Sequence, residues 1–150
     1  MSTETRKSNF TIASSGWLSI VSSVWSLVTV TSPVALFGST HGGVVAVVYN
    51  ATFAGTLGAM GLALVLRKPW ALSATIAATV SYTLDKMETI FDEAARKASL
   101  GEASALLADL GPAVEQTLVI MAWVFLFAWW SFAAYLYAKR DYFGERPASS

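Results

Sequence analysis

The sequence predicts an all-α fold, a bundle of four transmembrane helices, and three observations lead to it. Of the 150 residues, 55% are hydrophobic and 13% are charged, which is about half the charge of a typical water-soluble domain. Four apolar stretches are close to or longer than the roughly 20 residues that a helix needs to cross the hydrocarbon core. None alternates strictly between apolar and polar residues as a strand would. Because backbone groups in lipid must find partners within their own segment, we expect four helices.

Glycines and prolines separate the four expected spans. The spans cover about residues 10–37, 44–66, 70–91 and 113–138. A glycine-rich loop follows the first, and Pro69 and Pro112 open the third and fourth, because proline is well tolerated in the first turn of a helix. The first stretch exceeds the roughly 7–15-residue core of a cleaved signal peptide, so we interpret it as a retained span. The third is the least apolar, because Asp85 and Lys86 follow its uncharged residues 70–84.

The basic residues predict the direction of the bundle. With four spans, the two tails and the second loop share one side, and only Lys86, Arg96 and Lys97 fall on the other side. An excess of lysine and arginine marks the cytoplasmic side. We therefore expect cytoplasmic tails at residues 1–9 and 139–150 and an external acidic loop at about residues 92–112. We also expect the third helix to extend beyond the bilayer as far as Gly101, and a short amphipathic helix over about residues 102–110 to lie on the outer surface.

Small residues predict the contacts between helices, because helices in lipid associate through close packing. The expected packing residues are Ser15, Ser19, Ser22 and Ser26 in the first span, Gly55, Ala59 and Ala63 in the second, and Ala74 and Ala78 in the third. The fourth span differs, since tryptophans and phenylalanines surround it between residues 123 and 132. Two interpretations of this aromatic helix stay open: a wall that faces lipid, or a docking surface for a partner.

Polar residues near the expected outer ends form the candidate binding site. Asp85 lies about 22 Å along the third helix from its inner end, and an intramembrane carboxylate indicates a function because its charge is costly there. An outward-facing polar vestibule is expected to consist of Asp85, Glu88, Asn50, Gln116 and His41. The alternatives are that Asp85 is solvated or paired with Lys86, and that Asn50 and Gln116 only bond neighbouring helices.

Cofactor chemistry has little support in the sequence. The chain has no cysteine and one histidine, which excludes disulfides, thiolate metal sites and a bis-histidine haem. His41 and Asp92 are weak candidates for a metal site, since a histidine in a glycine-rich loop is more often a solvated residue. We expect neither a cofactor nor a metal. The ten basic and ten acidic residues cancel, so no global charge points to nucleic acid.

One stretch carries a family resemblance. Residues 57–71 read LGAMGLALVLRKPWA, an apolar helix that ends in basic residues before a Trp-Ala pair restarts the chain. This stretch resembles an element of small, uncharacterised four-helix inner-membrane proteins of bacteria. The resemblance implies a bacterial inner membrane and a four-helix fold, and it implies no activity. The long acidic third loop departs from the shorter loops of that pattern.

Three functions are compatible with these features. The first is a non-enzymatic accessory or structural subunit of a membrane complex, in contact with the bilayer and with a membrane-protein partner or further copies of itself. The second is a carrier of small solutes or cations that uses the vestibule around Asp85. The third is a lipid-binding protein or membrane enzyme, which only His41 and the expected surface helix support. The sequence favours the first, and we do not expect an enzyme.

Overall fold

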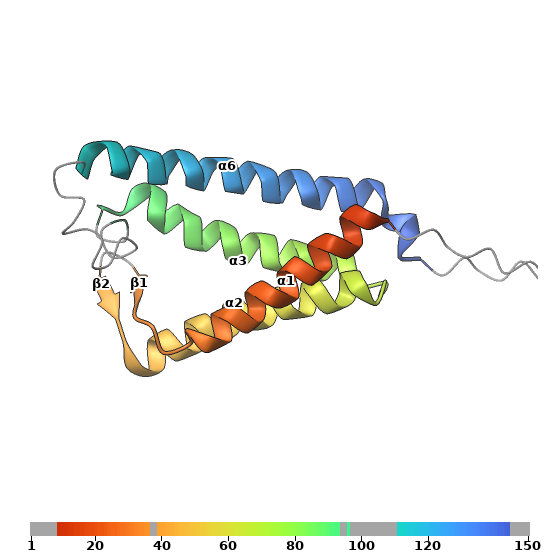
Figure 1. Ribbon diagram of the computed structural model, residues 1–150, viewed down its shortest axis with the longest axis horizontal. Coiled ribbons are helices and arrows are strands. Elements are labelled where there is room, and N and C mark those ends of the chain that lie inside the picture. Colours follow the sequence, from red (N-terminus) through yellow and green to blue (C-terminus); the bar gives the residue numbers. More distant parts are fainter. Residues whose placement is uncertain (1–8, 37–38, 94–95, 97–110, 145–150) are drawn as a thin grey trace, which may run out of the picture.

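The computed structural model describes residues 9–36, 39–93, 96 and 111–144. Four long helices run up and down in turn: α1 (Phe10–Val28), α2 (Gly43–Val65), α3 (Ala71–Phe91) and α6 (Gly111–Ala138) (Figure 1). The predicted helical fold is confirmed in these elements. The structure adds a small antiparallel hairpin of β1 (Val34–Leu36) and β2 (Ser39–His41), and a short 3-10 turn, η2 (Arg140–Tyr142), after α6.

Three of the four helices, α1, α2 and α6, are long and apolar enough to cross a membrane. The helix α3 is not among them, because Asp85, Lys86 and Glu88 interrupt its apolar run. The two ends of the bundle differ. One end carries the hairpin and is called the hairpin end below. The other end carries Arg67, Lys68, Lys139 and Arg140 and is called the basic end.

The first helix is shorter than predicted. We expected it to reach residue 37, but α1 ends at Val28, and the chain then turns, with the Ser32 N–H donating to the Thr29 carbonyl at 2.9 Å. Pro33 cannot donate to a helical carbonyl, and the β-branched residues 28–31 favour extended structure. The 19 residues of α1 still match the thickness of the hydrocarbon core.

The closest helix contact joins α1 to α2 and depends on glycine. A Cβ added at Gly61 would lie 2.7 Å from the Gly16 carbonyl oxygen and 2.9 Å from the Ile20 nitrogen. Further along the same pair of helices, the Ser23 hydroxyl donates to the Ala54 carbonyl of α2 at 2.8 Å. Such close backbone approach is the packing that small residues permit in lipid.

This contact corrects the predicted packing face of α2. Gly55 and Ala59 do not lie in the interface, and a Cβ at Gly55 would meet nothing within 4 Å; Ala63 is buried. Small residues recur on two faces of α2, and only one lies beside the large apolar side chains of the core. The face of α2 that packs against its neighbours is therefore the one that also carries the buried side chains of Leu57, Met60 and Leu64. The spacing of small residues alone did not distinguish this face from the other.

The helix α3 connects α2 to α6. Ala78 is buried and Ala74 packs against the core. The same helix carries three threonines at steps of four, Thr75, Thr79 and Thr83, each of which donates its hydroxyl to the carbonyl four residues earlier, at 2.7–2.8 Å. These bonds satisfy the hydroxyls within the helix, so the threonines need no water.

The helix α3 ends at Phe91 instead of continuing to Gly101. Asp92 has an extended backbone, with φ −110° and ψ 114°. The Arg96 guanidinium folds back and donates to the Ile90 carbonyl at 3.0 Å, which satisfies one of the last carbonyls of the helix. The predicted amphipathic helix at residues 102–110 lies outside the described residues.

The basic end closes with aromatic residues. The Asn9 side chain donates to the Tyr135 hydroxyl at 2.8 Å, and so links the start of α1 to the end of α6. The chain after α6 folds back against the bundle, where Phe143 is buried. The Arg67 guanidinium lies 5.2 Å from the centre of the Tyr142 ring, a distance typical of a cation–π contact. Both described ends of the chain therefore lie together at the basic end.

Candidate functional site

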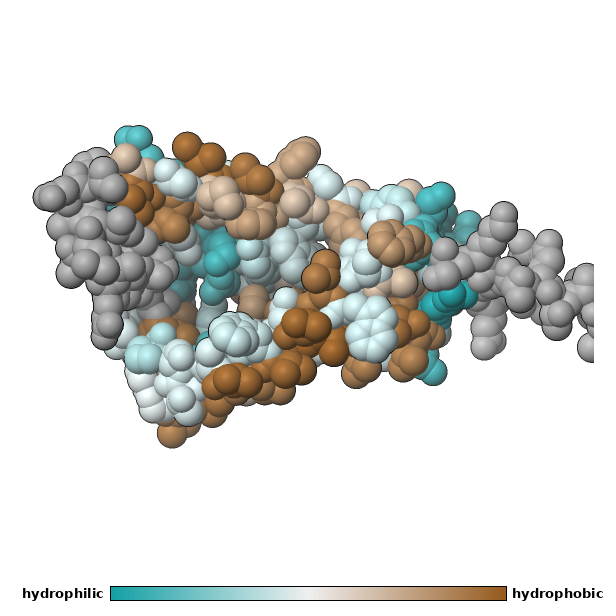
Figure 2. Space-filling model, viewed as in Figure 1, coloured by the Kyte–Doolittle hydropathy of each residue, from teal (hydrophilic) through white to brown (hydrophobic). Residues whose placement is uncertain are grey.

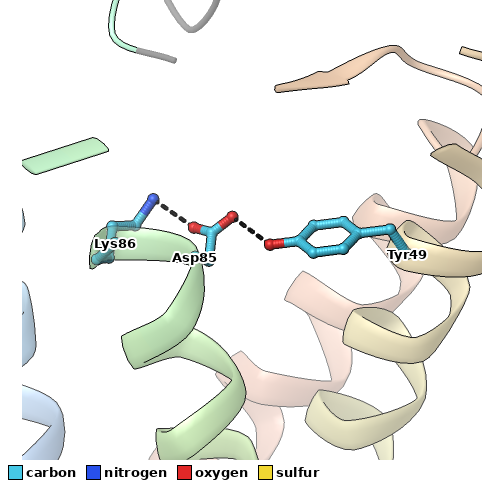
Figure 3. A network of polar contacts seen from close by, with 3 residues as sticks. All are labelled: Tyr49, Asp85 and Lys86. Atoms are coloured by element: carbon cyan, nitrogen blue, oxygen red, sulfur yellow. Dashed lines mark hydrogen bonds and ion pairs between the residues drawn. The ribbon is translucent and has the colours of Figure 1, made fainter. Parts of the chain in front are cut away.

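Asp85 forms a polar network toward the hairpin end of the bundle (Figure 3). Its Oδ1 accepts a hydrogen bond from the Tyr49 hydroxyl of α2 at 3.0 Å. Its Oδ2 lies 2.8 Å from the Lys86 ammonium. Lys86 also sits 5.3 Å from the centre of the Tyr82 ring. Asp85 is thus paired with Lys86, as one of the two interpretations from the sequence had it, and it also bonds α2. Nothing in the sequence pattern pointed to the role of Tyr49.

Asn50 bonds a neighbouring element. Its side-chain amide donates to the carbonyls of Val30 and Ser32, at 3.1 Å and 3.0 Å. These carbonyls follow the end of α1, where no helical partner is available to them. Asn50 therefore holds the turn that leads into the hairpin.

The remaining residues of the predicted vestibule lie in separate surroundings. Gln116 is exposed on α6 and lines a shallow groove with Arg96 and Glu115. His41 is half-buried in β2, where it pairs with Val34, and Glu88 is half-buried one turn beyond Asp85 on α3. Within the described part of the chain, no group of three or more histidine, aspartate or glutamate residues could hold a metal ion, and His41 and Asp92 form none.

The serines of α1 that we expected to pack against a neighbouring helix instead face an opening. Ser15, Ser19, Ser22 and Ser26 line a groove of about 730 Å³ between α1 and α6. Phe125, Trp129 and Phe132 of α6 form the opposite wall. The two helices meet at the basic end and diverge toward the hairpin end (Figure 1). In Figure 2 the surface is hollowed between them, with hydrophilic residues at the back of the hollow toward the hairpin.

The helix α6 presents a second apolar face at the edge of the bundle, to which it stays joined by the Trp130 indole N–H, which donates to the Thr83 hydroxyl of α3 at 3.2 Å. Its inner side packs on α3 through Ala122, Leu126 and Ala133, which are buried. A different set of residues recurs at alternating steps of three and four and is exposed throughout: Ile120, Trp123, Phe127, Trp130, Ala134 and Tyr137. We name this set the aromatic stripe. Alternating steps of three and four are the pattern by which one helix packs lengthwise on another. The composition of α6 was evident from the sequence, but the side that stays exposed was not.

Comparisons with known proteins add no family. Neither a family model, nor a curated protein, nor a solved structure matches the chain.

Proposed function

We propose that the protein is a non-enzymatic integral membrane subunit that docks a partner's transmembrane helix along the aromatic stripe of α6. The observation that carries this proposal is the continuous exposure of that stripe, from Ile120 to Tyr137, on a helix that packs only one side against α3. At about 1.5 Å per residue these 17 steps extend roughly 25 Å, most of the thickness of the hydrocarbon core.

The chemistry of the stripe suits a protein partner. Phe127 is 78% exposed and Trp123 51% exposed. Large aromatic residues provide much of the binding energy at protein interfaces, because they bury large areas with few rotatable bonds. Ala134 leaves a gap in the stripe, between Trp130 and Tyr137, into which a side chain of a facing helix can insert.

The proposed placement in the membrane includes a fourth crossing by α3. This helix has 21 residues, and it is the neighbour of both α2 and α6. Its first charge is Asp85, so the charged residues gather near one end of the helix. We propose that the basic end lies in the cytoplasm, following the excess of basic residues there, and that the membrane is a bacterial inner membrane, following the resemblance of residues 57–71.

Position-specific crosslinking tests the docking face. The chain contains no cysteine, so single cysteines can be introduced without a background reaction. A photoreactive maleimide at Trp123→Cys, Phe127→Cys or Ala134→Cys should crosslink in native membranes to the same partner band. Met121→Cys and Phe125→Cys, which are exposed on α6 outside the stripe, are the matched controls.

The expected result is a helical pattern in which stripe positions give at least about tenfold more product than the controls. Uniform crosslinking along α6 would mean that the stripe faces lipid. Recovery of each variant as a lone, uncrosslinked chain would also rule the docking function out.

A further inference from the structure

The groove between α1 and α6 has the shape of a wedge. It is closed at the basic end, where the Asn9 amide bonds the Tyr135 hydroxyl at 2.8 Å. Toward the hairpin end α1 and α6 diverge, and the floor consists of residues from α2 and α3, which include Phe53, Leu57 and Tyr82. Because α1 and α6 meet at the basic end, the space between them closes there. A membrane-spanning helix of a partner, with a constant diameter of about 10–12 Å, therefore has no room along the full length of the groove.

The size of the groove suits a small apolar ligand. Its volume of about 730 Å³ falls within the roughly 300–1,000 Å³ of ordinary ligand sites. Its walls carry Leu18, Val21 and Trp25 from α1 and Phe125 and Phe132 from α6. The buried serine among the wall residues also has a local partner, because the Ser19 hydroxyl donates to the Ser15 carbonyl at 2.8 Å. The lining is therefore mostly apolar, and the hydroxyls of Ser15, Ser22 and Ser26 are further polar groups on it.

A positive charge lies beside the wide end of the groove. Tyr82 belongs to the floor and stacks on Trp129, with ring centres 5.2 Å apart. Lys86 sits one turn further along α3, with its ammonium 5.3 Å from the centre of the Tyr82 ring. That ammonium has three N–H donors, and the contact with Asp85 at 2.8 Å occupies one of them. Lys86 lies outside the lining of the groove, so a phosphate at the wide end would have to contact the other donors at the rim, on the side of the ammonium away from the Asp85 carboxylate.

We propose that this groove is a phospholipid-binding site, in which one acyl chain lies between α1 and α6 and the lipid phosphate contacts Lys86. The apolar walls match the chain, and the cation at the open end matches the phosphate. In a membrane the groove opens sideways, so a lipid enters from the bilayer. The site lies on a different side of α6 from the aromatic stripe, and it stands or falls separately from the docking function.

Filling the groove tests where the lipid binds. The purified chain in mild detergent is titrated with phosphatidylglycerol and the bound lipid is counted by native mass spectrometry. Ala128→Phe adds a ring at an exposed alanine that lines the groove, and Ala134→Phe adds the same ring on the aromatic stripe. We expect one tightly bound lipid in the wild type, at least about tenfold weaker binding in Ala128→Phe, and unchanged binding in Ala134→Phe. Ser22→Leu, which fills the groove from α1, should repeat the loss.

The phosphate contact is tested with a second ligand. Diacylglycerol with the same acyl chains lacks the phosphate, so the wild type should prefer phosphatidylglycerol by about tenfold, the typical contribution of a hydrogen bond to a charged group. Lys86→Gln should remove that preference, and Lys68→Gln at the basic end should keep it. Circular dichroism confirms that each variant is folded. Equal losses of lipid binding in Ala128→Phe and Ala134→Phe would overturn the site. A photoreactive group at Ser22→Cys that crosslinks to a polypeptide in native membranes would also overturn it. An unchanged preference for phosphatidylglycerol in Lys86→Gln would overturn the phosphate contact.

Discussion

Among single residues, Gly61 has the strongest steric requirement in the described structure of α2. Because a Cβ there would press on backbone atoms of Gly16 and Ile20, at 2.7 Å and 2.9 Å, the helices must separate to admit it. We expect Gly61→Ala to lower the free energy of unfolding in detergent by about 1–3 kcal/mol, as overpacking does. Gly55→Ala is the matched control, since its Cβ would meet nothing within 4 Å. A similar loss in both variants would show that glycine flexibility, and not the close contact, is what matters.

The hydrogen bond from Tyr49 to Asp85 links two helices through one pair of side chains. Tyr49→Phe removes the hydroxyl that joins α2 to α3 at 3.0 Å, and we expect it to cost about 0.5–1.5 kcal/mol of stability. Tyr137→Phe, at an exposed ring of α6, should change nothing. A double-mutant cycle with Asp85→Asn separates the pairwise bond from other effects, and an additive cycle would contradict the coupling.

Asp85→Asn also tests the carrier hypothesis that the sequence raised. In the structure both carboxylate oxygens have partners, Tyr49 and Lys86, and this arrangement explains the residue as a link between helices. On the accessory-subunit proposal, Asp85→Asn lowers stability and leaves solute or cation uptake by vesicles that contain the protein indistinguishable from that of protein-free vesicles. Uptake that depends on the wild-type protein and disappears in a folded Asp85→Asn variant would favour the carrier.

Among the helices, the sequence predicted three of the four membrane spans closely, although the expected continuation of α3 beyond its span to Gly101 was wrong. The helices α2, α3 and α6 begin and end within about two residues of the expected spans, because Pro69 and the Gly–Pro pair at residues 111–112 mark their borders. The end of α1 was missed. Valine and threonine are apolar enough to continue a hydropathy pattern, yet residues 29–36 leave the helix and form a turn and a strand.

Asn50 helps to explain why α1 ends earlier than its hydropathy predicts. By donating to the carbonyls of Val30 and Ser32, it stabilises the turn after α1. We expect Asn50→Asp, which keeps the size of the side chain but removes both N–H donors, to speed hydrogen exchange of the amides in residues 34–36 and 39–41, with no change in α2. Thr52→Val is the control, since the Thr52 hydroxyl bonds its own helix, at Val48. Unaltered exchange in the hairpin would show that the pairing of β1 with β2 is stable without the Asn50 hydrogen bonds.

In the whole molecule, the residue types that line the groove between α1 and α6 could be predicted from the sequence, but their arrangement in space could not. The sequence identified the serines of α1 and the aromatic residues of α6, but it did not show that the two would face each other across a groove. Their functional interest comes from the divergence of α1 and α6, which depends on contacts distant in sequence. Asn9 joins α1 to α6 at Tyr135, while Ser23 holds the rest of α1 against α2 at Ala54. No periodicity within one helix reports whether a neighbour covers its face. The vestibule was a similar case, because Asn50 and Gln116 were expected at a similar depth and face different neighbours.

The position of α3 in the bundle predicts that the chain crosses the membrane four times. The helix α3 lies between α2 and α6 and connects the basic end to the hairpin end. If α2 and α6 cross the bilayer, their neighbour α3 is held at the same depth, even though Asp85, Lys86 and Glu88 make it the least apolar of the four. The network of Asp85 with Tyr49 and Lys86 lowers the cost of placing these charges near the membrane surface.

Single cysteines in the cysteine-free chain can decide this number. We expect Ser39→Cys in the hairpin and Glu93→Cys after α3 to react with a membrane-impermeant maleimide added to intact cells. Lys68→Cys and Asp141→Cys, at the basic end, should react only after the membrane is opened. If Glu93→Cys were instead protected like Lys68→Cys, while Asp141→Cys reacted in intact cells, the chain would cross an odd number of times. In that case α3 would not span, and the sideways opening of the groove to lipid would have to be abandoned with it.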